Sequence, residues 1–433
     1  MGPRLWAQTP PSGGISDTLN HPPPTSGPDA YSPPYGAFMP NQSGFLTLGQ
    51  SYVDPVFGTT IRRMSARYPE TEPGFIYAKN GYWNADGTRY LAAFTQGGTF
   101  PKQIIDTTTL AVLRSGVPGN ADLSFDPVNP DVYYYFNGSN LTQYSISSGA
   151  STVTKAFAGS LGSLGGSVDW IDNSGRYMVL SIGGVFRVWD KQTDTLFAGS
   201  ISDSFGNGWI GMAPDGSGVL IANGSQGRWY PLDFTSQVLA SSPSSTFAVS
   251  GDHADMVSAS DGQTYLVVGR EQGSFDTTVR FNVRTGAVQT LITYNNSFGA
   301  WCDGRHYSGV SRGSLRDWML VDTETDSNYC GGADAITNPD PVASWWKFRQ
   351  EIIMVNVLTG ELRRLAHHRS RHTEQYCQQP RVNVNWDGTM VMFPSNFGVV
   401  VGGCGYSDLY SVAIPSIGGT PLPPSAPVNL RLQ

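Results

Sequence analysis

The sequence predicts an all-β protein, a seven-bladed β-propeller with a proline-rich N-terminal tail and a C-terminal linker. The first observation is composition: among 433 residues there are 51 glycines and only 14% charged residues, which is typical of turn-rich β-proteins. The second is a set of turn signals that recur at a regular interval. The third is alternation of apolar and polar residues in short runs such as RYMVLSIGGVFRVWD and TYLVVGRE, with no long helical pattern.

The turn signals contain Asp-Gly or a close relative, and each predicts a tight turn between two strands. They lie near Asp86, Asp126, Asp172, Asp215, Asp261, Asp303 and Asp387. The first six are about 40 to 46 residues apart, and the last interval is about twice as long. Such a period with several strands per unit is typical of a propeller, so seven signals predict seven blades.

The long interval predicts an insertion in the sixth blade, SNYCGGADAITNPDPVASWWKFRQ. The alternative, two stacked β-sandwiches, is disfavoured by the unbroken repeat.

The two ends of the chain differ from the repeat region in composition. Residues 1–50 are rich in Pro, Gly and Ser and predict an extended tail that drapes over the domain. Residues 51–416 form the predicted propeller, in which VFGTTIRRMS is the outer strand of the last blade and closes the ring. Residues 417–433 are a proline-rich linker whose end, SAPVNLRLQ, resembles the start of a fibronectin type III module. A tail that paired with another subunit would build oligomers or filaments.

Charge and cysteine usage limit the class of partner and the compartment. The net charge is −7 and no basic patch occurs, which excludes a nucleic-acid binder. No apolar run is long enough to span a membrane. We expect an extracellular or cell-surface location, where disulfides form. The predicted pairs are Cys302 with Cys330 and Cys377 with Cys404, and four free buried thiols are the alternative.

Histidines mark the candidate functional region, because propellers carry function in loops at one end of the channel. Apart from His21 they all lie in the second half, in three consecutive blades: His253, His306, His367, His368 and His372. Each also has a structural interpretation. His253 could cap a turn and His306 could pack around a disulfide, whereas the last three, together with Arg369, are expected in a solvated loop.

Two stretches resemble a known family. The run WKFRQEIIMVNVLTGELRRLAHHRS followed by YCQQPRVNVNWDGTMVMFPSNFG resembles the last two blades of secreted bacterial seven-bladed propellers related to oligogalacturonate lyases and ulvan lyases. The GDHAD stretch strengthens the likeness, which covers roughly residues 250 to 412. The resemblance implies a polysaccharide lyase that acts on uronic acids.

The chain departs from this family at the metal site. Oligogalacturonate lyases hold a divalent metal with a histidine from one blade and a Gln-x-x-His-x-His run from the next. His306 matches the first ligand and Gln378 the glutamine, but Arg381 and Asn383 stand at the two histidine positions. Arginine is always protonated and cannot ligate a metal. We therefore expect no cofactor, and a divalent metal is the alternative that these two replacements leave open. The early-blade histidines of ulvan lyases have no counterpart, since no histidine lies between His21 and His253.

The remaining residues can still support β-elimination, which needs a neutralised carboxylate, a base and an acid. Arg381 could grip the substrate carboxylate in place of the metal, with help from Arg305 and Gln378. His253 or His306 could be the base. The expected acid is Tyr307 or Tyr376, and Trp345 and Trp346 could stack on sugar rings. The structural alternatives are a buried Arg381 with a protein partner and a tryptophan pair that packs the insertion onto its blade.

The leading functional interpretation is a propeller that binds an acidic polysaccharide, extended to β-eliminative cleavage. The alternative from another class is a non-catalytic structural or adhesive module of a larger extracellular protein. A hydrolase with paired carboxylates is a third interpretation, for which the sequence shows no convincing Asp/Glu pair.

Overall fold

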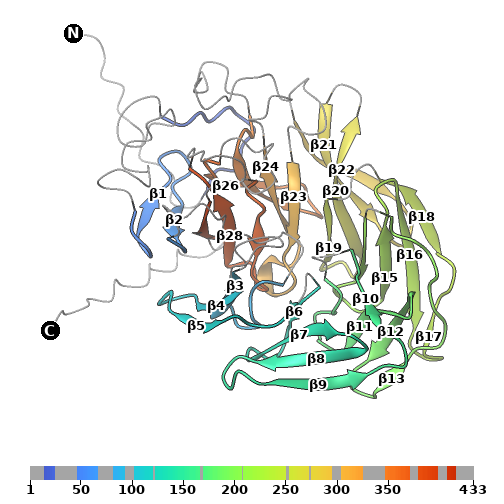
Figure 1. The fold of residues 1–433 in the computed structure, drawn as a ribbon. Helices are drawn as coiled ribbons and strands as arrows, with labels where there is room; N and C mark the ends of the chain where they lie inside the picture. The colour runs from blue at the N-terminus through green and yellow to red at the C-terminus, as the bar shows by residue number, and fades with distance from the viewer. Residues whose placement is uncertain are drawn as a thin grey trace, which may run out of the picture.

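Seven antiparallel sheets follow one another around a ring in the computed structural model (Figure 1). The structure describes residues 14–24, 46–66, 81–92, 102–119, 122–165, 169–206, 208–249, 253–272, 275–294, 304–324, 347–370, 379–397 and 407–415. The predicted all-β, seven-bladed propeller is confirmed. Among these residues no helix is both long enough and apolar enough to cross a membrane.

The first three blades contain short strands in sequence order. Blade 1 consists of β3 (Arg89–Ala92), β4 (Gln103–Asp106) and β5 (Val112–Ser115). Blade 2 consists of β6 (Ser124–Phe125), β7 (Val132–Asn137), β8 (Asn140–Ser145) and β9 (Ser151–Ala156). Blade 3 consists of β10 (Leu161–Gly162), β11 (Tyr177–Ile182), β12 (Val185–Asp190) and β13 (Thr195–Leu196).

The next three blades continue this order. Blade 4 consists of β14 (Trp209–Met212), β15 (Gly218–Ala222), β16 (Gln226–Asp233), β17 (Val238–Leu239) and β18 (Ser245–Ala248). Blade 5 consists of β19 (Ala254–Ser258), β20 (Thr264–Gln272), β21 (Phe275–Asn282) and β22 (Val288–Thr293). Blade 6 consists of β23 (Gly304–Gly309), the 3₁₀ helix η2 (Gly313–Leu315), β24 (Trp318–Thr323), β25 (Glu351–Asn356) and β26 (Leu362–His367). The predicted insertion lies inside blade 6, between β24 and β25.

Blade 7 joins the two ends of the repeat region. It combines β27 (Asn383–Val384), β28 (Met390–Ser395) and β29 (Asp408–Ala413) with β2 (Thr60–Arg63) and β1 (Ser51–Val53). In Figure 1 the blue strands β1 and β2 lie beside the red strand β28. Strand β2 pairs with β29, with Ile61 opposite Val412. The predicted closure of the ring by residues 56–65 is therefore confirmed.

Five of the turn signals form the same turn, between the first two strands of blades 3, 4, 5 and 7 and, in blade 1, between the two residues of the Trp83–Tyr90 bridge. Their glycines all have φ between 69° and 79°. In each case the glycine N–H donates to the carbonyl three residues earlier, as Gly216 does to Ala213 at 2.9 Å. Glycine is required there because side chains disfavour this left-handed conformation. The members are Gly87, Gly175, Gly216, Gly262 and Gly388.

The sixth signal does not mark the equivalent turn. Asp303 directly precedes β23, whereas the turn between the first two strands of blade 6 is formed by residues 310–317 and contains η2. Asp303 lies outside the described residues, so the turn predicted at it stays a prediction, while the blade count was right. The turn between β23 and β24 contains no Asp-Gly pair.

Apolar side chains fill the spaces between neighbouring blades and hold the ring together. One cluster joins blades 2 to 5 and includes Trp170 and Trp229. A second joins blades 6 and 7, a third joins blade 7 to blades 1 and 2, and a fourth joins blades 5 and 6. Rigid packing of this kind fixes the positions of side chains at the ends of the strands.

The described part of the N-terminal tail lies against blade 6. Ile15 forms a bridge with Arg364 of β26, in which each residue's N–H donates to the other's carbonyl. The His21 carbonyl lies 3.0 Å from Nε2 of His367. Ile15 therefore adds one bridge at the outer edge of the sheet of blade 6. The C-terminal linker and all four cysteines lie outside the described residues, so the predicted disulfides stay predictions.

Candidate functional site

Two of the predicted histidines lie together where the first strands of blades 5 and 6 begin. His253 directly precedes β19, and His306 is near the start of β23. Their rings stack with centroids 4.6 Å apart and an interplanar angle of 26°. His306 is 1% exposed, whereas His253 is only half-buried. His253 therefore forms the outer member of the stack.

Two carboxylates lie close to Nδ1 of His306. Strand β24 runs back beside β23, contains Asp322 and ends at Thr323, and Glu324 follows directly. Residues two apart on a strand face the same side, so both acids point toward His306. Nδ1 of His306 lies 3.2 Å from Oδ1 of Asp322 and 3.2 Å from Oε1 of Glu324. Both acids are buried.

This arrangement favours the charged forms of His306 and Asp322. Burial alone would lower the pKa of His306, but Asp322 and Glu324 outweigh it and raise that pKa above its usual value. Burial opposes ionisation of Asp322, yet the charge and hydrogen bond of His306 and the Val382 amide lower the pKa of its carboxyl group. His306 and Asp322 are therefore a buried pair in which each group favours the charged form of the other.

Blade 7 contacts this cluster from the side. The backbone N–H of Val382 donates to Oδ2 of Asp322 at 3.0 Å. Arg381 precedes Val382 and is completely buried, and Asn383, the first residue of β27, is also buried. Arg381 is thus the sequence neighbour of the residue whose N–H contacts Asp322. Its side chain lies in the protein interior and not on the surface of the channel mouth.

The ends of blades 6 and 7 contain further buried arginines. Arg349, Arg364, Arg369 and Arg381 are all completely buried. Arg364 forms two hydrogen bonds with the Glu351 carboxylate, at 2.6 and 2.7 Å, and its guanidinium lies 5.0 Å from the Phe348 ring centroid. Because buried charges need partners, such pairs are the expected state of these side chains.

The loop that follows β26 differs from the expectation of a solvated loop. His367, His368 and Arg369 are completely buried, so that expectation was wrong for them. Nε2 of His368 lies 2.8 Å from the Thr323 carbonyl, and its Nδ1 accepts a hydrogen bond from the Ser370 N–H. Burial, reinforced by Arg369 and Arg364, holds the pKa of His367 well below its usual value. His372 lies outside the described residues.

The other predicted site residues are not brought together by the described structure. The Tyr307 ring lies in the core between blades 5 and 6, with its hydroxyl 3.2 Å from Oγ1 of Thr278. The side chain of Arg305 is not described. Four further candidates lie outside the described residues: Trp345, Trp346, Tyr376 and Gln378.

Sequence analysis missed the acidic residues of this region. Asp322 and Glu324 form the Asp/Glu pair that the sequence did not reveal, and they lie with His306 in a group whose ligand atoms are all within 4.8 Å. The signal was present in VDTETD, where alternate residues at the end of an apolar strand are acidic. It stays ambiguous in sequence because exposed strand ends also carry acids.

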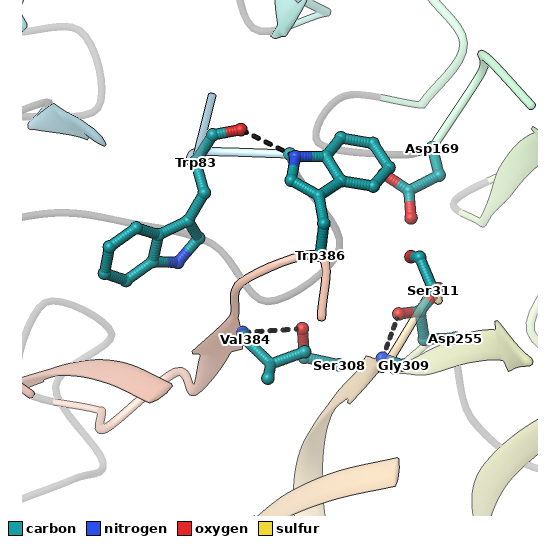
Figure 2. Close-up of a pocket in the computed structure, with 9 residues that line it drawn as sticks. Trp83, Asp169, Asp255, Ser308, Gly309, Ser311, Val384 and Trp386 are labelled. Atoms are coloured by element: carbon teal, nitrogen blue, oxygen red, sulfur yellow. Dashed lines mark hydrogen bonds between the residues drawn. The ribbon is translucent and has the colours of Figure 1, made fainter. Parts of the chain in front are cut away.

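A small cavity lies further along the same first strands (Figure 2). It is lined by Asp169, Asp255, Ser308, Ser311, Trp83 and Trp386, among others. Figure 2 shows Asp255 accepting the Gly309 N–H and Ser308 accepting the Val384 N–H, at 2.7 and 3.1 Å. These residues come from blades 1, 3, 5, 6 and 7, so the cavity belongs to the central channel. It does not include the histidine pair.

The metal site of the resembling lyases does not fit at the matching positions. Arg381 provides a guanidinium where an imidazole would be needed, and it is completely buried. Asn383 offers only a neutral amide, which is a weak ligand for a transition metal. The described residues at these positions cannot reproduce a site built from two blade-7 histidines.

Comparison with known proteins supports the fold. No protein-family model and no curated protein sequence matches the chain. An oligogalacturonate lyase solved with manganese aligns over 86% of this chain and 99% of its own, with a TM-score of 0.51 and 15% identity. A second oligogalacturonate lyase, from Vibrio parahaemolyticus, aligns over 86% of this chain and 98% of its own, with a TM-score of 0.47 and 13% identity. At such identity the likeness shows a shared seven-bladed propeller fold and no more.

Proposed function

We propose that this protein binds an acidic, uronic-acid polysaccharide at the channel end formed by blades 5 to 7 and cleaves it by β-elimination. The observation that carries the proposal is the stack of His253 on His306, at 4.6 Å, with two carboxylates behind it. The fold shared with an oligogalacturonate lyase agrees with it. We further propose that the protein acts outside the cell or at its surface.

His253 is the better base of the two histidines because it is the one that a substrate can reach. A neutral imidazole near neutral pH can accept the proton on the carbon next to the uronate carboxylate. The C5–H bond breaks, its electrons form the C4–C5 double bond, and the C4–O bond breaks. The leaving oxygen takes a proton from water or from an acid such as Tyr376. No oxidant or other co-reactant is required.

His306 supports His253 in this proposal and does not touch the sugar. It is fully buried and fixed through Nδ1 by Asp322 and Glu324, so it holds the stacked His253 ring in one orientation. Arg381 is buried too, and the grip on the substrate carboxylate expected of it would require its guanidinium to become accessible. That role stays a prediction.

The alternative is a non-catalytic binding or adhesive module. The specific observation in its favour is that protein partners neutralise several charged groups of this region. Glu351 pairs with Arg364, and Asp322 and Glu324 surround His306. Buried ion pairs of this kind also occur where the only role of the side chains is to fix the fold.

The test is incubation of the full chain with a panel of uronic-acid polysaccharides while the ultraviolet absorbance of the new double bond is followed. We expect activity that falls by about 10²- to 10⁴-fold in His253→Gln, the usual contribution of a general base. His21→Gln is the matched control, since His21 lies in the N-terminal segment away from the stack, and it should retain activity.

Two outcomes would contradict the proposal. The first is equal activity of His253→Gln and the wild-type chain. The second is the absence of product on every substrate. Affinity electrophoresis in gels that contain the same polysaccharides then decides between a binding module, which is retarded, and a purely structural one, which is not.

A further inference from the structure

The residues around His306 fit a metal-binding role that the sequence suggested for His306 but not for Asp322 or Glu324. We propose that His306, Asp322 and Glu324 bind one divalent metal ion through Nδ1 of the imidazole and one oxygen of each carboxylate. This set differs from that of the resembling lyases, since its acids come from β24 of blade 6 and not from blade 7. It does not depend on the proposed cleavage of a polysaccharide.

The spacing of the donor atoms suits a metal ion. Nδ1 of His306 lies 3.2 Å from an oxygen of each acid, and all three ligand atoms lie within 4.8 Å of one another. Adjacent ligands of an ion with bonds of about 2.1 to 2.3 Å lie roughly 3 to 3.3 Å apart. An ion can therefore enter between the three atoms with little movement of the side chains.

The backbone already orients the central ligand. Oδ1 of Asp322 accepts the backbone N–H of His306 at 3.2 Å, and Oδ2 accepts the N–H of Val382 at 3.0 Å. Both donors belong to neighbouring strands or strand starts, so the carboxylate is fixed from blades 6 and 7 at once. Such outer contacts commonly position metal ligands and raise their affinity.

The charge of the cluster also favours a cation. All three side chains are at most 2% exposed, so the two acids and the imidazole face one another in the protein interior. Buried acidic groups are costly unless a group of opposite charge lies close to them. A divalent ion between the three side chains would be such a group.

The donor set indicates the class of metal. Two carboxylates and one imidazole suit Mn²⁺, whereas Mg²⁺ keeps more of its water and Ca²⁺ prefers oxygen alone. Zn²⁺ would compete, because it accepts both nitrogen and carboxylate ligands. We expect Mn²⁺ to bind more tightly than Mg²⁺ or Ca²⁺.

The test is isothermal titration of the chelator-treated full chain with Mn²⁺, without any sugar. We expect one ion per chain and an affinity that falls at least about tenfold in Glu324→Gln and in Asp322→Asn. Electron spin echo spectra of bound Mn²⁺ should show coupling to one imidazole nitrogen, which His306→Gln removes. Glu361→Gln is the control, since Glu361 is an exposed acid in the same blade.

The results separate this proposal from the proposed function. The metal site is overturned if Mn²⁺ and Zn²⁺ give no binding heat, or if the ion binds equally well to Glu324→Gln. Glu324→Gln is the decisive variant if Asp322→Asn does not fold. Metal binding without double-bond formation would reject only the lyase, and double-bond formation by a chain that binds no metal would reject only the site.

Discussion

Among single residues, the most unusual group is the set of completely buried charged side chains in blades 6 and 7. Arg364 shows how such a charge is accommodated. It pairs with Glu351, contacts Asp17 and the Leu19 carbonyl of the N-terminal segment, and lies over the Phe57 and Phe348 rings. Each of its planar donors thus meets an acceptor, which is the geometry that favours arginine over lysine in buried sites.

Glu351 predicts a pH dependence of stability. Burial raises its pKa to about 7 from 4.5, and Arg364 offsets this only in part. The folded chain thus holds this proton more tightly than the unfolded chain does. Its contribution to stability is complete below about pH 4.5 and is lost as the pH rises through about 7. The free energy of unfolding of Glu351→Gln minus that of the wild type should therefore rise between about pH 5 and about pH 8. The rise should be up to about 3 kcal/mol.

Urea unfolding at a series of pH values measures this difference. Glu361→Gln is again the matched control, and the difference between it and wild type should stay flat over the same range. A flat profile for Glu351→Gln would mean that Glu351 is ionised throughout and that Arg364 fully compensates its burial.

Among the elements, β26 is the edge strand that receives an additional partner. An exposed edge presents unpaired N–H and C=O groups, and residues 14–24 cover this one. The Ile15 N–H donates to the Arg364 carbonyl at 3.1 Å, and the Arg364 N–H donates to the Ile15 carbonyl at 2.8 Å. The N-terminal segment is thus part of blade 6.

Ile15→Pro tests this pairing. Proline removes the N–H that Arg364 accepts and so should weaken the contacts of Asp17 with Arg364 as well. We expect a loss of about 1 to 3 kcal/mol in the free energy of unfolding and faster proteolysis near residue 20. The control is Ser16→Ala, at an exposed neighbouring position, which should change neither the free energy of unfolding nor the rate of proteolysis. If Ile15→Pro proves as stable as Ser16→Ala, the N-terminal segment does not stabilise blade 6.

At the scale of the whole molecule, the ring is closed by a buried ion pair in blade 7. Arg63 of β2 donates two hydrogen bonds to Asp408 of β29, and the Ser65 hydroxyl donates to the other oxygen of Asp408 at 2.8 Å. The two strands are separated by almost the whole chain. The pair therefore links the first and last parts of the propeller.

Asp408→Asn should destabilise the protein by about 3 to 5 kcal/mol, because it leaves the buried Arg63 without its counter-ion. Chemical unfolding measures the loss. Asp233→Asn, at an exposed turn, serves as the control and should have little effect. A loss below about 1 kcal/mol would show that the main-chain pairing of β2 with β29 alone closes the ring.

The loop of residues 311–317 links blade 6 to the turns of other blades. Arg312 donates to the Pro127 carbonyl of blade 2 at 2.9 Å and to the Ala85 carbonyl of blade 1, and its backbone N–H donates to the Trp386 carbonyl of blade 7. Asn173 of blade 3 donates to the Ser311 carbonyl. Because these turns belong to four other blades, the loop crosses the end of the channel opposite the histidine stack.

Arg312→Ala should therefore lower the free energy of unfolding by about 2 kcal/mol or more, the usual loss for hydrogen bonds from a charged donor. Thermal melting gives the readout. Arg316→Ala removes the same type of side chain from an exposed position in the same loop and should be close to neutral. Identical melting of the two variants would show that the loop contacts do not stabilise the ring.

The sequence by itself determined the blade number, the insertion in blade 6 and the closure of the ring, because turn signals and strand alternation are local. It also singled out His253 and His306, whose rings the structure stacks. It could not place His367, His368 and Arg369, since polar segments look alike whether solvated or buried. Only the tertiary structure decided that Asp322 and Glu324 meet His306, and that residues 310–317 form the turn between β23 and β24. The physical reason is that pairing of β23 with β24 brings the acids to His306, and packing between blades, not local sequence, decides which polar side chains are buried.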